Sequence, residues 1–210
     1  LMQEHQCNAF SATCQEFCVS RLAMQHKVTP CLTHSLLKDE GFASGCEADL
    51  NVTFSIAMQI YLAERAPYMG NTLIHDREKN LVSIHHDVPA RKMMGYEQPD
   101  LPFSMVSFTE RNWGATLRYD FSRDRGMPVT FCRMTPKLDK MVVVSGEMLD
   151  VGGLDQWGCQ LKAVIQVSDA MKYFQAARQT GHHYSMVYGD YIAQMRTVAE
   201  VLGMEMEEIT

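Results

Sequence analysis

The stretch Gln160-Leu-Lys-Ala-Val-Ile-Gln-Val167 carries the clearest fold signal in the chain. Apolar residues occupy positions 161, 163, 165 and 167, and they alternate with Gln160, Lys162 and Gln166. In an extended strand, successive side chains point to opposite faces. The alternation therefore predicts a β-strand with one dry face and one wetter face.

Five similar short runs precede this strand, and turn residues bound them. The runs cover residues 81–85, 105–108, 116–121, 129–133 and 141–148. Turn signals fall at residues 76–80, 99–102, 122–128, 135–140 and 150–153. Short runs broken by turn residues are typical of antiparallel β-structure. About six such strands can close into a small barrel, so we expect a six-stranded antiparallel Greek-key β-barrel.

A helix is expected before the β region. Residues 49–65 contain no Gly or Pro, and their apolar side chains fall at helical spacing. Asp49 or Asn51 can cap the first turn, which leaves Glu47 in the loop that leads into the helix.

Two shorter helices are expected after the β region. Ser168 can cap a helix at 168–180 that stops at Gly181, and a second helix at 190–202 ends at Gly203. The fold class predicted from these patterns is α+β. It has an α-rich segment at residues 1–70 and a β-barrel domain with closing helices at residues 71–210.

Length and composition are those of an ordinary globular protein. The 210 residues fit one large domain or two small ones, and 46% of them are hydrophobic. The net charge of −6 is spread along the chain without a Lys or Arg stripe, so nucleic acid and anionic membranes are poor partners. Apolar runs are far shorter than the roughly 20 residues that cross a bilayer, and we expect no transmembrane or signal segment. Seven cysteines without CxxC pairs indicate reduced thiols and a cytoplasmic protein.

Four of the eight histidines form two adjacent pairs, His85-His86 and His182-His183. Neighbours in an extended segment point to opposite faces, so at most one member of each pair would reach a common site. Histidines that are satisfied within the fold or lie on the surface are the alternative explanation.

Glu47 and Asp49 are two carboxylates separated by one residue. In an extended loop both could face a metal ion, whereas in a helix they would diverge by roughly 200° and only one could. Oxygen ligands mixed with imidazole suit Mn²⁺, Mg²⁺ or Co²⁺. The alternative is a helix cap beside a surface acid, because a helix N-terminus also favours an ionised carboxylate.

Five segments between residues 41 and 203 carry motifs in a fixed order. They are Gly41-Phe-Ala-Ser-Gly-Cys-Glu-Ala-Asp49, Met69-Gly-Asn71, Leu81-Val-Ser-Ile-His85 followed by Pro89, Gly158-Cys-Gln160 through Val167, and Gly181-His-His-Tyr184 with Gly189-Asp190. Together they resemble the L-fucose/L-arabinose isomerase family. The resemblance implies that this chain is the C-terminal part of such an isomerase, with residues 1–70 as the remnant of an α/β middle domain.

The resemblance implies a metal-dependent interconversion of an aldose and its ketose through a cis-enediolate, on a deoxyhexose or pentose. Mn²⁺, or Mg²⁺ or Co²⁺, would bridge two sugar oxygens while a carboxylate moves the proton between C1 and C2. By position, Glu47 is implied as metal ligand and catalytic proton carrier, and His183 as the closing metal ligand. His85 is implied as a ligand, as in the arabinose branch, or as a substrate contact, as in the fucose branch. His182 would bind the sugar, and the family implies a homo-oligomer.

Asn71 stands where the family carries its second metal-binding and catalytic acid. Its amide can offer a carbonyl oxygen to a cation, but it brings no charge and cannot act as a base. A second proton carrier would then be Asp49, Asp76, Glu16 or a bound hydroxide, and the sequence does not choose among them.

Trp113 precedes a predicted strand, and an aromatic side chain there could bind substrate by stacking on the sugar, with core packing as the alternative. Asn71 and the short chain leave open a non-catalytic sugar-binding or assembly member of the same family. An unrelated histidine-rich metal-binding barrel is a third possibility. Because the sequence opens at Leu1 without a start-up pattern, we expect the tail of a longer polypeptide, with poor or no turnover alone.

Overall fold

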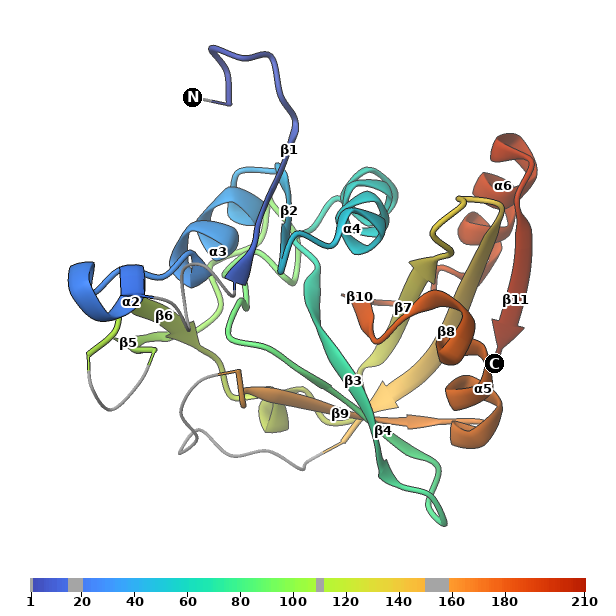
Figure 1. Cartoon of the computed structure of the whole chain (residues 1–210). Coiled ribbons are helices and arrows are strands. Elements are labelled where there is room, and N and C mark those ends of the chain that lie inside the picture. Colours follow the sequence, from blue (N-terminus) through green and yellow to red (C-terminus); the bar gives the residue numbers. More distant parts are fainter. Residues whose placement is uncertain (1, 15–20, 109–111, 150–158) are drawn as a thin grey trace.

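A closed barrel of six antiparallel strands forms the centre of this chain (Figure 1). The computed structural model describes residues 2–14, 21–108, 112–149 and 159–210. The barrel strands are β3 (Tyr68–Asp76), β4 (Leu81–His85), β7 (Pro128–Met134), β8 (Lys140–Met148), β9 (Lys162–Val167) and β10 (His183–Tyr188). The α+β class and the six-stranded antiparallel barrel predicted from the sequence are confirmed.

The strands follow the order β8-β7-β10-β3-β4-β9, and pairing of β8 with β9 closes the ring. Strands β7, β8 and β9 are successive neighbours, and β10 returns to lie beside β7. This arrangement of four strands is a Greek key. Outside the ring, β11 (Glu205–Ile209) adds to β8 in parallel.

Two of the six strands predicted to form the barrel do not belong to it. The runs at 105–108 and 116–121 correspond to β5 (Ser104–Ser107) and β6 (Ala115–Arg118), which form a separate two-stranded hairpin. The second run also ends early, because the short 3-10 helix η1 (Phe121–Asp124) follows. Strands β3 and β10 take the two places in the barrel, and the turn predicted at 150–153 lies outside the described residues.

Strand β10 was not predicted from the sequence pattern, because both faces of this strand are buried. Tyr184, Met186 and Tyr188 join the barrel interior, whereas His183 and Ser185 are buried on the outer face. A strand covered on both sides has no polar face, so the alternation that reveals a half-exposed strand is lost.

The barrel interior is filled by aromatic and branched side chains from all six strands. Its members include Tyr68, Val82, Phe131, Val144 and Ile165. Helix α5 (Ala170–Thr180) adds Tyr173 to this core, and the Tyr173 hydroxyl donates to Thr72 of β3. Asp169 rather than Ser168 caps α5, because its carboxylate accepts the main-chain N–H groups of Met171 and Lys172. Gly181 ends the helix, as predicted.

Helix α4 (Leu50–Ala63) covers the outer face of β10 and β7. Asp49 caps it by accepting the N–H of Val52, which is one of the two caps the sequence allowed. Gln59 donates to the main-chain oxygen of Ser185 at 2.9 Å and so fixes the helix to β10. On the other side, α6 (Ile192–Leu202) packs on β8 and ends at Gly203, as predicted.

Before α4, two short strands pair in parallel: β1 (Ala9–Ala12) and β2 (Ala43–Cys46). Parallel strands need a crossover connection, and α2 (Arg21–His26) and α3 (Cys31–Asp39) lie in the chain between them. The boundary predicted after residue 70 falls inside β3, and the division into two domains stays a prediction. No helix in the described part of the chain is long and apolar enough to cross a membrane.

Gly70 of β3 lies against the main chain of His85 in β4. A Cβ atom at position 70 would come within 2.5 Å of the His85 carbonyl oxygen, so the two strands would have to separate. We expect Gly70→Ala to lower the free energy of unfolding by about 1–3 kcal/mol in urea denaturation. Gly126→Ala is the control, because no atom lies within 4 Å of its Cβ position and only the φ of 84° opposes the change. Gly126→Ala therefore measures the cost of a left-handed backbone alone, roughly 1–2 kcal/mol. A loss of less than about 0.5 kcal/mol in Gly70→Ala would contradict the close approach.

Candidate metal centre

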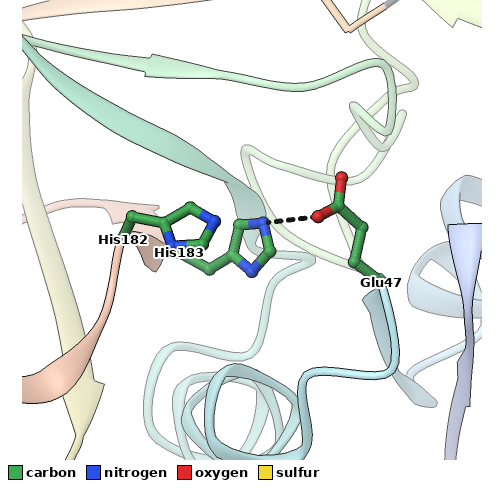
Figure 2. Close-up of side chains that lie close together, drawn as sticks. All are labelled: Glu47, His182 and His183. Atoms are coloured by element: carbon green, nitrogen blue, oxygen red, sulfur yellow. Dashed lines mark ion pairs between the residues drawn. The ribbon is translucent and has the colours of Figure 1, made fainter. Parts of the chain in front are cut away.

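Glu47 and the adjacent pair His182-His183 come together in space from distant parts of the chain. The expectation that at most one member of each pair reaches a common site was wrong here, because His182 lies before the start of β10 and is not part of the extended strand. The ligand atoms of these three residues all lie within 4.8 Å of one another. Within the described ranges this is the only group of three or more His, Cys, Asp or Glu side chains close enough to hold one metal ion. Figure 2 shows the His183 ring beside the Glu47 carboxylate, with His182 next to it.

A strained turn places Glu47. It lies between the end of β2 and the cap of α4, and both Glu47 and Ala48 have left-handed backbone conformations, with φ of 61° and 54°. For residues with a Cβ atom this costs roughly 1–2 kcal/mol each. The turn is held by a hydrogen bond from Ala48 N to Ala12 O and by one from Cys46 N to the Met69 sulfur of β3. Strain of this kind concentrates at functional sites.

The Glu47 carboxylate lies between two imidazoles. Its Oε2 atom is 3.3 Å from Nε2 of His183, and its Oε1 atom is 3.3 Å from Nε2 of His86. The contacts with His183 and then His86 hold the pKa of Glu47 well below its ordinary value, although burial opposes this. The side chain is still 34% exposed, so a ligand can reach it.

Asp49 faces the same His183 ring from the other side. Its Oδ2 atom is 2.9 Å from Nδ1 of His183 and accepts a hydrogen bond from Arg133 at 2.7 Å. Its Oδ1 atom caps α4. Burial alone would raise the pKa of Asp49, but the bonds from His183 and Arg133 outweigh it and lower that pKa. Asp49 therefore orients His183, while Glu47 faces the open side of the ring.

The remaining ring nitrogen of His183 is suited to a cation. The Asp49 carboxylate can only accept a hydrogen bond, so Nδ1 of a neutral His183 ring must carry the proton. The lone pair of the ring then lies on Nε2. This buried atom has no hydrogen-bond partner. A carboxylate that holds a ligand histidine in this way is the usual arrangement behind a metal-bound imidazole. Burial would lower the pKa of His183, but the contacts with Asp49 and Glu47 outweigh it and raise that pKa, because the two carboxylates make the surroundings of the ring negative.

Asn71 lies in the same row as His183 and His85. It is the direct partner of His183 across β3 and β10, and of His85 across β3 and β4. Directly opposed residues in antiparallel strands point to the same face with Cβ atoms about 4.5–5.5 Å apart. The amide of Asn71 is thus a neighbour of the His183 ring on the barrel's outer face.

His85 contacts Ser83 and does not join the group around Glu47. Its Nε2 atom lies 2.6 Å from the Ser83 hydroxyl, while burial and then Lys162 lower its pKa. The member of this pair that contacts Glu47 is His86, to which the sequence assigned no role. In the sequence, His86 is marked only as a member of the His85-His86 pair directly after a predicted strand. Which of the two histidines reaches Glu47 depends on where β4 ends.

The other predicted residues lie elsewhere. Trp113 is in the connection between β5 and β6, where the Lys27 ammonium is 6.0 Å from its ring centroid. Asp76 is at the far end of β3 and accepts main-chain hydrogen bonds from Glu78 and Lys79 in the turn. Glu16 lies outside the described residues. Of the carboxylates considered as second proton carriers that lie in the described ranges, Asp49 is at the site and Asp76 is not.

The known proteins that this chain resembles in sequence are named as isomerases of a sugar. No family model matches the chain. Proteins named sulfoquinovose isomerase from Priestia aryabhattai and Priestia megaterium are each 26% identical to it over 180 residues, which cover 84% of this chain and 39% of the relative. The protein of that name from Alkalicoccus urumqiensis is 27% identical over 190 residues, covering 85% and 40%.

The chain spans about two fifths of the length of these curated relatives. Their names support a sugar isomerase as the class of protein that this chain resembles. The narrower resemblance to L-fucose and L-arabinose isomerases stays a prediction.

Asp49→Asn separates helix capping from the orientation of His183. Asn still caps α4, but its NH₂ group can donate to Nδ1 of His183 and shift the ring proton to Nε2, where the lone pair is then lost. We expect the affinity for Mn²⁺ in isothermal titration calorimetry to fall about 10–100-fold, with an unchanged circular dichroism spectrum. Asp169→Asn at the cap of α5 is the matched control. An unchanged affinity in Asp49→Asn would show that the orientation of His183 does not depend on Asp49.

Proposed function

We propose that this chain supplies the metal-binding and proton-transfer residues of an aldose-ketose isomerase. The observation that carries the proposal is the convergence of Glu47, His182 and His183 within 4.8 Å. One carboxylate and two imidazoles form a mixed oxygen and nitrogen ligand set that suits a divalent transition-metal ion such as Mn²⁺ or Co²⁺ better than Mg²⁺. The similarity to proteins named sulfoquinovose isomerase supports the same class of reaction.

A divalent ion bound here would polarise the sugar oxygens at C1 and C2 and so acidify the C2 proton. The residues of the chain have separate tasks around it. His183 and His182 offer ring nitrogens, and Glu47 offers a carboxylate oxygen. Glu47 is also accessible enough to take the proton from C2 and return it to C1, a step in which a positioned acid-base group is usually worth 10² to 10⁴ in rate.

A groove beside His182 offers room for the rest of the sugar. It lies between β3 and α5, has a volume of about 670 Å³, and is lined by Phe174 and Arg178 of α5 as well as by His182. Sites for small molecules usually measure about 300–1,000 Å³. The half-exposed Phe174 ring can stack on a sugar face, as was expected of Trp113, and Arg178 can bind an anionic substituent. Sulfoquinovose, L-fucose and L-arabinose are therefore the sugars to compare.

Proton exchange tests the function even when ketose forms slowly. With Mn²⁺ in D₂O, we expect the chain to introduce deuterium from solvent into one of these sugars, detected by mass spectrometry. Glu47→Gln removes the base and is expected to slow the exchange about 100-fold or more. Glu97→Gln, on the exposed surface, is the matched control. Exchange that continues unchanged in Glu47→Gln would refute the role of this carboxylate.

The second candidate is a sugar-binding or assembly protein without turnover, which the uncharged Asn71 favours. Asn71→Asp places a negative charge next to His183, and we expect it to raise the Mn²⁺ affinity about tenfold or more, because ligand charge tunes such sites over decades. Asn112→Asp in the β5–β6 connection is the control. Ketose that forms in Asn71→Asp but not in the unchanged chain would favour the non-catalytic candidate. Equal ketose formation in both would contradict it.

A further inference from the structure

The imidazoles of His86 and His183 lie at equal distances from Glu47. Their Nδ1 atoms, however, face different kinds of hydrogen-bond partner. Nδ1 of His183 faces the Asp49 carboxylate at 2.9 Å, whereas Nδ1 of His86 accepts the main-chain N–H of Asp87 at 3.2 Å. A carboxylate can only accept a hydrogen bond from a neutral imidazole, and a main-chain N–H can only donate a hydrogen bond to it. The two environments therefore select different tautomers.

In His86, the accepted N–H bond requires a lone pair on Nδ1. A neutral ring then carries its proton on Nε2, the atom that lies 3.3 Å from Oε1 of Glu47. An Nε2–H group is a hydrogen-bond donor and has no lone pair for a cation. In His183 the neutral ring has the reverse arrangement, with its lone pair on the buried Nε2 atom, which makes no hydrogen bond and lies 3.3 Å from Oε2 of Glu47.

The surroundings of His86 hold the ring in this orientation. Its side chain is fully buried. Its main-chain N–H is bonded to Leu161 O at 3.0 Å and to the Tyr68 hydroxyl at 2.8 Å. The Asp87 side chain accepts from Arg118 and from the main-chain N–H of Leu161, which fixes the peptide that donates to the ring. A flipped ring would place carbon against this N–H and lose the bond.

We propose that His86 is a positioning residue and not a metal ligand. Its Nε2–H group binds Oε1 of Glu47 and holds the carboxylate so that Oε2 stays next to the free nitrogen of His183. The inference rests on the proposed function of Glu47 as ligand and proton carrier. It divides the two histidines into one that presents a lone pair to the ion and one that presents a proton to the carboxylate.

Nitrogen NMR on the ¹⁵N-histidine-labelled chain reads both tautomers directly. In metal-free protein we expect His86 to show a protonated Nε2 and an unprotonated Nδ1, with the resonances assigned by their loss in His86→Gln. On addition of Zn²⁺, which is diamagnetic, Nε2 of His183 is expected to shift while His86 keeps its Nε2 proton. A proton on Nδ1 of His86, or loss of its Nε2 proton when Zn²⁺ binds, would overturn the inference.

The same spectra separate this inference from the proposed function. If Zn²⁺ shifts neither histidine, the metal site fails while the tautomer of His86 in the metal-free chain still decides the hydrogen-bond assignment. If Zn²⁺ shifts His183 and deprotonates His86, the metal site stands and the positioning role is lost.

Rescue by a conservative change tests what the hydrogen bond contributes. His86→Leu removes the donor and is expected to lower the Mn²⁺ affinity about 10–100-fold, as for other partners of ligand side chains. His86→Gln restores an N–H donor toward Glu47 and is expected to recover most of that loss. His75→Gln, on the exposed end of β3, controls for the substitution itself. Equal losses in the Leu and Gln variants would show that packing, and not the donated proton, is what His86 supplies.

Discussion

The contact between Asp49 and His183 joins the two halves of the structure that make the site. Asp49 begins α4 and caps it, while His183 begins β10 of the barrel. The same carboxylate also accepts from Arg133 of β7, so one side chain ties the helix to two barrel strands. Because the cap fixes where α4 starts, it also fixes the left-handed turn that carries Glu47. Together with the hydrogen bonds from Ala48 to Ala12 and from Cys46 to Met69, this contact holds the Glu47 turn against the histidines.

Charge is distributed unevenly among the three acids near the site. Asp49 is paired with Arg133, and Asp87 with Arg118, so both negative charges are balanced by guanidinium groups. In the part of the chain that the structure describes, the recorded ion-pair partners of Glu47 are histidines. An imidazole can give up its proton, and with it its charge, when a cation binds, whereas a guanidinium cannot. Of these three acids, Glu47 is thus the one whose charge would remain for the proposed cation.

Local pattern predicted the elements that have one polar face or a clear cap. The strand at 81–85, the alternating run before Val167, and the helix after Asp49 depend on nearest neighbours, and the sequence displays them. Strand β10 was missed because α4 covers its outer face. The choice of His86 over His85 could not be predicted, since it depends on where β4 ends and on the N–H group of Asp87. That Glu47 and His183 share one site was predicted from the family resemblance and not from their spacing in the sequence.

The neutral side chain at position 71 changes what such a site can do. Asn71 is next to His183 in the strand register, so any ion there would have one carboxylate, imidazoles and at most an amide oxygen around it. Fewer negative ligands bind a divalent ion less tightly. They also leave more of its positive charge to polarise the oxygens of a sugar, which is the property that acidifies a neighbouring C–H bond. Weak metal binding and effective proton transfer would therefore be compatible at this site, and the neutral side chain of Asn71 does not by itself imply loss of catalysis.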